Sequence, residues 1–487
     1  MLLGILLLLR GLLLAGAGRA LAPADTLPRG QYPVLVPADT LVRVVACPGV
    51  ARAAVGSVLF LGNAVTKERI LRAELDFHEG DTLSLADLSA RLEANRRRLF
   101  NLQLFHAVVA QSTCSGGRLL VVFGVQERWY TFPVPILSLA DRNLRSWLAR
   151  PDRWRRVDYG LHVTQSNFRG RNEQVIANLQ LGFNRKYELF YEAPGLGHYR
   201  RLGFGAGASY YQSRTLDYVT RADRLVPLRA DAGFPIQRFY ATAGLRLRHT
   251  VQFLTALDAS YHREQINDSV KRYNPDYYQG RTQREYLALT LTSTRNQRNT
   301  FAYPLTGQYA QATLTHRIFL DATTPSLTAL RLNYARYLAL GYGFYYSLGL
   351  TGQARFTRHL AYADARALGY DDLVRGYDEY VVDGRHYGLV QQGLSYCLLQ
   401  PRPIRLQSIT NPKINTIPLA LYLNIFADAG YVAAPTPTPQ NRLPNQLLSA
   451  VGLGLHLVTY YDRVFTVEYT LNGLGQTGYF FRAEFPI

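Results

Sequence analysis

The chain has 487 residues, 48% of them hydrophobic, and a formal net charge of +19. The length allows two or more domains, but no interior run of about 18 apolar residues predicts a membrane-spanning helix. No basic cluster with interleaved aromatic residues stands out, so we expect no nucleic-acid partner for this charge. The 34 tyrosines, 22 phenylalanines and 39 glycines favour a chain built mainly of β-strands.

Residues 1–22 have the features of a secretory signal peptide. Leu2 to Leu14 is almost wholly aliphatic, and Ala20-Leu21-Ala22 or Ala15-Gly16-Ala17 offers a cleavage site of the A-x-A type. Arg10 interrupts the apolar stretch, so a non-cleaved helical anchor is the alternative, although the stretch is short for one. We therefore expect export, followed by a proline-rich linker over residues 23–54.

A compact α/β unit is predicted over residues 55–128. Val58–Leu61 forms a strand before a turn at Gly62-Asn63. Thr66 is expected to cap one helix and Ser84 to open a second. Two further strands around Ser115-Gly116-Gly117 complete one small α/β layer.

The three cysteines, Cys47, Cys114 and Cys397, have no metal-binding spacing. In an oxidising compartment Cys47 and Cys114 could pair and leave Cys397 free. Three unpaired thiols are an equally good interpretation, so the sequence leaves the pairing open.

From residue 150 to residue 487 the sequence alternates apolar and polar residues with a period of two. Val451, Leu453 and Leu455 alternate with small or polar residues. In the expected last strand, Tyr479, Phe481 and Phe485 alternate with Phe480, Arg482, Glu484 and Pro486. Such segments of about ten residues are typical of a transmembrane antiparallel β-barrel, and about 16 strands fit. A soluble β-sandwich is the rival, but the stretch is long for a single sandwich.

One polar loop carries a distinctive motif, Val374-Arg375-Gly376-Tyr377. It resembles the V-R-G-F/Y signature of the BamA/TamA family of outer-membrane assembly proteins. Tyr303–Gly307 is similar to the family's P-x-x-G motif, and Phe426–Gly430 is similar to its F-x-D-x-G strand. The unit over residues 55–128 resembles a POTRA (polypeptide-transport-associated) domain, with Leu61-Gly62-Asn63 and Val125-Gln126-Glu127-Arg128 among its landmarks.

The resemblance implies that Arg375 pins its loop inside the barrel. Alternation places Asp428 on the inner face, where it would be the lumen partner of Arg375, close to Gly430. Where the family commonly has a glutamate in an E-Y/F-R strand, this chain has Ser395-Tyr396-Cys397. Glu468, also expected in the lumen, is the candidate substitute.

The resemblance further implies a bacterial outer-membrane protein with its POTRA domain in the periplasm. Its function would be assembly, insertion or translocation of other proteins, by templating of strands at a seam between the first and last strands, near Tyr159 and Phe485. Expected partners are outer-membrane lipids, client β-barrel or secreted proteins, and periplasmic chaperones or lipoproteins at the POTRA domain, which could equally be a spacer. Two alternatives stay open: a dedicated two-partner-type secretion pore, and a passive barrel that anchors a surface complex.

We expect no enzyme activity, cofactor or metal. The sequence has no G-x-S-x-G, Walker or HExxH motif and no paired catalytic carboxylates. The glycine-rich stretches Gly203–Gly207 and Gly341–Gly343 have a period of two and no following helix, so they favour strands and not nucleotide loops.

Overall fold

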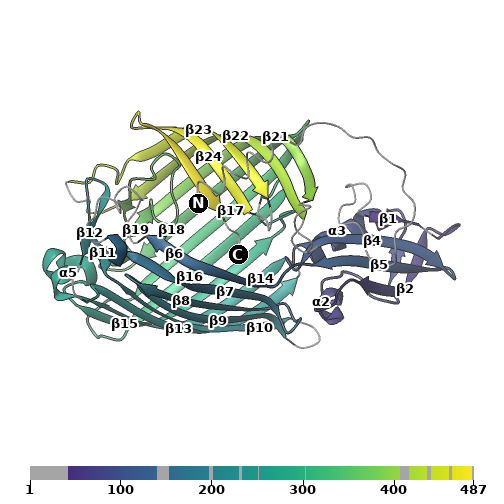
Figure 1. Cartoon of the computed structure of the whole chain (residues 1–487), viewed down its shortest axis with the longest axis horizontal. Helices are drawn as coiled ribbons and strands as arrows, with labels where there is room; N and C mark the ends of the chain where they lie inside the picture. Colours follow the sequence, from purple (N-terminus) through teal and green to yellow (C-terminus); the bar gives the residue numbers. More distant parts are fainter. Residues whose placement is uncertain are drawn as a thin grey trace. The chain divides into compact units, whose positions relative to one another are not determined.

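A computed structural model describes residues 42–139, 153–196, 201–229, 233–250, 252–301, 303–405, 416–435, 440–459 and 463–484, apart from Ala46. The predicted signal peptide and Phe485 lie outside these residues. Within them the chain forms a small α/β unit followed by a large antiparallel sheet (Figure 1).

The α/β unit is a five-stranded sheet with strand order β1-β4-β5-β2-β3 and two helices. Its elements are β1 (Val42–Val44), β2 (Arg52–Leu61), α2 (Glu68–Arg72), β3 (Thr82–Ser84), α3 (Leu88–Phe100), β4 (Phe105–Ser115) and β5 (Arg118–Glu127). The core consists of apolar side chains from the sheet and both helices, including Leu71, Leu92 and Phe123, all fully buried. This burial is the main stabilising contribution to the unit.

The predicted linker over residues 23–54 is wrong at its end, because β1 and the start of β2 belong to this sheet. β1 pairs in parallel with β4, and a disulfide joins Cys47, which follows β1, to Cys114 near the end of β4. The short strand was missed because β-pairing and a cross-link, not local sequence pattern, hold it. Cys397 is a free thiol.

The helix starts also differ from the prediction. α2 begins after Lys67, and the Thr66 hydroxyl donates instead to the Glu127 carboxylate at 2.6 Å. Glu127 also accepts the backbone N–H groups of Val65 and Thr66, so it fixes the turn that precedes the helix. Ser84 ends β3, and α3 starts only at Leu88.

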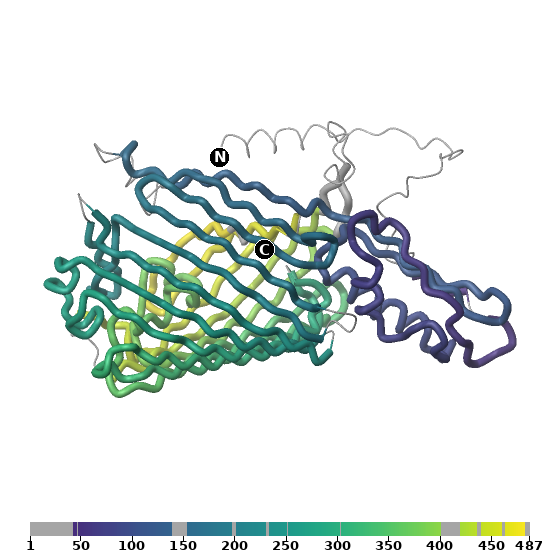
Figure 2. The backbone as a smooth tube through the Cα atoms, turned by 90° about the horizontal axis from the view of Figure 1, so that it is seen from below, coloured from purple at the N-terminus to yellow at the C-terminus, as the bar shows by residue number. Residues whose placement is uncertain are grey.

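The second part is one sheet of sixteen strands, each antiparallel to its neighbours, as the sequence predicted. In Figure 2 the strands lie side by side, and they are tilted relative to the axis of the barrel into which the sheet curls. The strands are β6 (Thr131–Leu139), β7 (Val157–Phe168), β8 (Glu173–Gly182), β9 (Arg185–Leu196), β10 (Leu202–Ser213), β13 (Ile236–Thr250), β14 (Phe253–Ile266), β15 (Gln283–Asn296), β16 (Gly307–Phe319), β17 (Leu327–Gly341), β18 (Phe344–Phe356), β21 (His386–Arg405), β22 (Thr416–Ala433), β23 (Leu447–Thr459), β24 (Arg463–Asn472) and β25 (Thr477–Glu484).

The sheet begins earlier than predicted. Its first strand is β6, before the expected start at residue 150, so the strand that contains Tyr159 is the second. Pro133 and Pro135 interrupt the alternation in β6, and a strand interior rarely contains proline. The two prolines are the reason why the period-two alternation did not predict this strand.

The two faces of the sheet differ in chemistry. On β22, Leu423 and Ile425 are exposed on the outer face, whereas Asn424, Phe426 and Asp428 are buried on the inner face. Leucines dominate the outer face of most other strands as well. A continuous apolar outer band around a polar interior is the pattern of a membrane-spanning barrel.

Smaller elements gather at the barrel end that lies opposite to the start of β6. They are the hairpin β11 (Thr215–Arg221) and β12 (Arg224–Arg229), the helices α5 (Asp268–Tyr273), η3 (Pro275–Tyr278) and η4 (Tyr362–Asp364), and the pair β19 (Arg366–Leu368) and β20 (Val382–Asp383); η2 (Arg153–Arg155) precedes β7. Tyr277, Tyr278 and Val270 form a buried apolar cluster there with hairpin side chains. None of the described helices has the length and apolar character needed to cross a membrane.

Candidate functional site: an arginine-centred contact between a loop and the barrel wall

The loop between β18 and β21, residues 357–385, contains the Val374–Tyr377 motif as a tight turn. The Tyr377 N–H donates to the Val374 carbonyl at 3.1 Å. Gly376 has a φ of +88°, which residues with a side chain rarely adopt, and a Cβ there would lie 3.0 Å from the Thr470 hydroxyl. Glycine therefore lets the turn lie against β24 while Arg375 extends along the wall.

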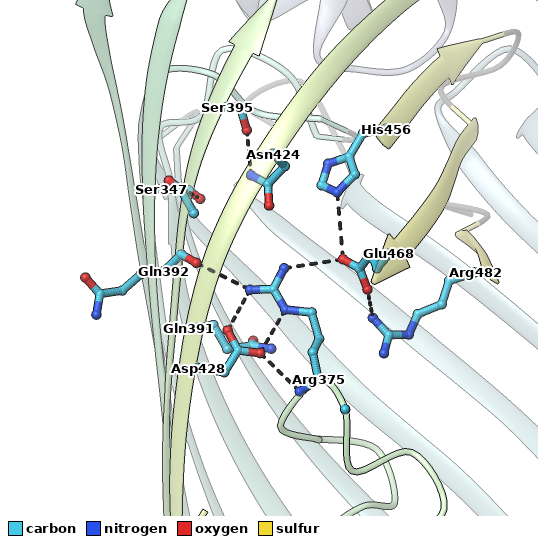
Figure 3. A network of polar contacts seen from close by, with 12 residues as sticks. Ser347, Arg375, Gln391, Gln392, Ser395, Asn424, Asp428, His456, Glu468 and Arg482 are labelled. Atoms are coloured by element: carbon cyan, nitrogen blue, oxygen red, sulfur yellow. Dashed lines mark hydrogen bonds and ion pairs between the residues drawn. The ribbon is translucent and has the colours of Figure 1, made fainter. Parts of the chain in front are cut away.

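Arg375 meets Asp428 through two parallel side-chain hydrogen bonds (Figure 3). The distances are 2.8 Å from Nε to Oδ2 and 2.6 Å from Nη2 to Oδ1. The Arg375 backbone N–H also donates to Oδ2 at 3.1 Å. The Asp428 side chain is 0% exposed, and the guanidinium carbon lies 3.7 Å from the centre of the Phe426 ring. A bidentate pair in this setting fixes the direction of the arginine as well as its position.

Glu468 on β24 is the second carboxylate at the site. Its Oε1 lies 3.4 Å from Arg375 Nη1, and its Oε2 accepts a hydrogen bond from Arg482 Nη1 at 2.5 Å. Arg482 in turn donates to Asp378, just beyond the motif, at 2.6 Å. Figure 3 shows that the loop and the strands β22, β24 and β25 all supply members of this network. Glu468 therefore lies within ion-pair distance of Arg375, whereas position 395 carries a serine and no carboxylate.

Small and apolar residues complete the contact. A Cβ on Gly430 would lie 2.7 Å from both Leu368 and Val374, so only glycine leaves room for the loop at this point of β22. Val374 and Tyr377 are buried in an apolar cluster with Val432 from the wall. The loop is therefore held by packing as well as by charge.

Ser395 points to a different set of partners. Its hydroxyl accepts a hydrogen bond from Asn424 Nδ2 at 2.8 Å and lies 3.5 Å from the Tyr303 hydroxyl. Tyr303, in the segment before β16, also lies 3.0 Å from His456 Nδ1 and packs against the Tyr422 ring. The P-x-x-G segment thus reaches the same inner wall.

Further ion pairs of the same loop were not predicted. Asp364 accepts bonds from Arg284 at 2.6 Å and from Arg317 at 2.8 Å. Asp372 pairs with Arg331 at 2.8 Å. These partners lie on strands far away in sequence, and only the alternation of arginines on the inner face could have indicated them. The loop is therefore held to both sides of the barrel interior.

The predicted C-terminal strand residues lie on β25. Tyr479 and Phe481 are exposed on its outer face at 81% and 62%, and Tyr479 packs against Tyr469 of β24. They are separate from the arginine-centred contact.

The interior next to Arg375 contains a cavity of about 440 Å³, lined by Tyr303, Gln391, Asn424 and Glu468 among others. Among the described residues, no group of His, Cys, Asp and Glu side chains is arranged to hold a metal ion. The arrangement is suited to positioning a loop, because its charged atoms are largely engaged with one another.

Two family models match the chain. The POTRA model, described as a surface antigen variable number repeat, matches residues 53–128. The model of the Omp85 superfamily domain matches residues 167–459, more than half of the chain. No curated protein matches the sequence.

Solved structures of low sequence identity share the fold. BamA from Haemophilus ducreyi lacking POTRA domains 1–3 aligns with a TM-score of 0.50 and 14% identity, over 91% of this chain and 84% of that one. CdiB from Escherichia coli aligns with a TM-score of 0.51 and 12% identity, over 88% and 76%. With the matching domain models and the sixteen-stranded sheet, these comparisons lead to one conclusion: the chain belongs to the Omp85 superfamily of outer-membrane β-barrels, with one POTRA domain before its barrel.

Proposed function

We propose that this protein resides in the bacterial outer membrane, with its POTRA domain in the periplasm, and inserts or translocates other proteins. The observation that carries the proposal is the seam between the ends of the sheet. Among the described residues, β6 and β25 share no ladder of hydrogen bonds. Unpaired backbone groups are costly in a hydrocarbon environment, and an added strand would satisfy them.

The Arg375 contact supports the wall next to this seam. It connects the loop to β22 and, through Glu468 and Arg482, to β24 and β25. We assign Arg375 a structural role: it keeps the last strands in place while the edge of β25 stays available. A loop held inside the barrel also favours this function over a passive, permanently open pore.

The POTRA domain would bind client segments or periplasmic chaperones and lipoproteins, or act as a spacer. Because β3 pairs with β2 only over Arg52–Ala54, the remainder of β2 is the natural place for an added strand, but side chains occupy this edge at Val58. The Val58 N–H donates to Glu79 at 3.0 Å, and Arg72 donates to the Val58 carbonyl at 2.9 Å. These contacts favour the spacer role unless a partner displaces both side chains.

Comparison of the outer-membrane and secreted proteomes of cells with and without this protein tests the proposal. Loss of many barrel proteins would indicate general insertion, and loss of one exported protein would indicate dedicated translocation. If both proteomes were unchanged, the proposal would be wrong and a passive anchoring barrel would take its place.

A further inference from the structure

Two arginines lie on the outer, apolar face of the barrel wall. Arg295 on β15 and Arg336 on β17 belong to stretches whose register with β16 is continuous, without a bulge. Side chains at an even spacing along a strand share a face. Arg295 has this spacing from the exposed Leu291, and Arg336 has it from the exposed Leu332. Both arginines therefore face outward, on strands that are about 10 Å apart.

Both arginines lie toward the barrel end at which the POTRA domain joins the chain. β6 begins at this end, directly after the POTRA domain, and each strand is antiparallel to its neighbours. β15 therefore ends there, and Arg295 is next to its last residue. Gln308, which lies opposite Arg336, follows the first residue of β16. An arginine on the outer face of a membrane barrel costs little at such a rim, where the lipid headgroups lie, and much more at the middle of the bilayer.

The positive charge of these arginines is not compensated by the protein. Among the described residues, Arg295 forms no ion pair or hydrogen bond, and Arg336 donates only to the neutral Gln308 side chain, at 3.0 Å. The strands β16, β17 and β18 contain no aspartate or glutamate. The only acidic residue of β15 is Glu285, near the opposite end of that strand. Two guanidinium groups, each with five N–H donors, are thus left for an anion from outside the chain.

An open groove of about 700 Å³ lies in the same outer wall. Its lining extends from Phe253 and Arg295, on β14 and β15, to Gly388 on β21, and it includes Ala310 and Ala312 on β16. A Cβ on Gly388 would meet no atom within 4 Å, so internal packing does not require a small residue there. The volume is in the range of small-molecule sites, about 300–1,000 Å³. An apolar groove with a cation at one end is suited to a ligand with apolar chains and an anionic head.

We propose that this groove binds an anionic phospholipid of the periplasmic leaflet. Its acyl chains lie over Ala310 and Ala312, and its phosphate accepts hydrogen bonds from Arg295 and Arg336, since the guanidinium fork matches phosphate oxygens. A zwitterionic headgroup fits less well, because its ammonium group would meet two cations and no carboxylate.

The lipid site is separate from the seam. β15 and β16 are the two central strands of the sheet order, whereas β6 and β25 are its ends. The proposal rests on the proposed function only for the location, since it needs the POTRA end of the barrel to lie at a lipid headgroup layer. It does not depend on insertion or translocation of a client.

Native mass spectrometry of the full-length protein in detergent micelles tests the proposal. The probes are anionic dioleoylphosphatidylglycerol and zwitterionic dioleoylphosphatidylethanolamine, which have the same acyl chains. Arg295→Gln with Arg336→Gln removes the two cations, and Ala312→Trp fills the groove. The matched controls are Arg263→Gln and Ala259→Trp, which change outward-facing residues of β14 outside the groove. Heat-modifiable migration in SDS gels first shows that each variant is folded.

We expect the first phosphatidylglycerol to bind about tenfold more tightly than phosphatidylethanolamine. The double arginine variant and Ala312→Trp should each weaken this binding severalfold, and the controls should not. Equal affinity for the two lipids, or unchanged binding when the groove is filled, would overturn the proposal. Dimers of the protein in place of lipid adducts would also overturn it, because a second copy would then cover the groove. None of these results involves a client, so the proteome comparison tests insertion or translocation separately.

Discussion

Replacement of Arg375 by alanine should destabilise the barrel strongly. The change removes two charge-assisted hydrogen bonds to Asp428, at 2.8 and 2.6 Å, and the ion pair to Glu468. The Asp428 side chain has no solvent exposure and would keep only the backbone N–H donor of residue 375. Loss of one partner from a buried ion pair costs about 3–5 kcal/mol, because the remaining charge is uncompensated.

Such a cost corresponds to a change of roughly two to three and a half powers of ten in the unfolding equilibrium. The assay is the temperature and urea dependence of heat-modifiable migration in SDS gels, which separates folded from unfolded barrel. Arg336→Ala is the matched control, because this outer-face arginine donates to the neutral Gln308 side chain at 3.0 Å. We expect a much larger effect at Arg375 than at Arg336.

A second substitution tests the cause. Asp428→Asn removes the buried charge, so in the Arg375→Ala background it should restore part of the lost stability, although in the wild type it destabilises. Equal stability of Arg375→Ala and the wild type would refute the reasoning. So would strict additivity of the two substitutions, because contacting charges must show a coupling energy.

Three further changes have expected outcomes. Glu468→Gln keeps the shape but removes the charge, and should lower barrel stability by about 1–2 kcal/mol in urea titrations, less than Arg375→Ala; an effect as large as that of Arg375→Ala would contradict the ranking. Glu79→Ala should speed hydrogen exchange of the Val58 amide severalfold, whereas the control Glu68→Ala should not. The hydrogen bond from Val58 and the charge of Arg72 lower the pKa of Glu79. Protection of the Val58 amide in the wild type should therefore persist at neutral pH and be lost as the pH falls through that lowered pKa. Cys47→Ser removes a disulfide that closes a loop with a sequence separation of 67 residues, and should lower the stability of the POTRA domain by about 4 kcal/mol. The measurement is the thermal midpoint of the POTRA domain with and without reductant. A midpoint that changes neither with the substitution nor with reductant would show that the disulfide contributes nothing.

The sequence predicted those parts of the fold that rest on local pattern. Period-two alternation placed Asn424 and Asp428 on the inner face, and that is where they lie. The start of the barrel was missed because Pro133 and Pro135 break this pattern in an edge strand, where proline is better tolerated than in the middle of a sheet. β1 was missed because three residues carry too little signal without β4 beside them.

The arginine-centred contact was predictable only in outline. The family resemblance and the period-two alternation together predicted that Arg375, Asp428 and Glu468 lie inside the barrel. The pairs of Asp364 with Arg284 and of Asp372 with Arg331 depend on the path of a long loop through the barrel. No local sequence rule specifies that path, since the partners lie on different strands.

Reconstitution tests the central claim most directly. The purified protein is placed in lipid vesicles, and a urea-unfolded outer-membrane barrel protein is added outside, with protein-free vesicles as the control. The account predicts faster appearance of folded, protease-resistant and heat-modifiable client in the presence of the protein. Equal folding rates in both kinds of vesicle, together with no transfer of client into the vesicle interior, would contradict it.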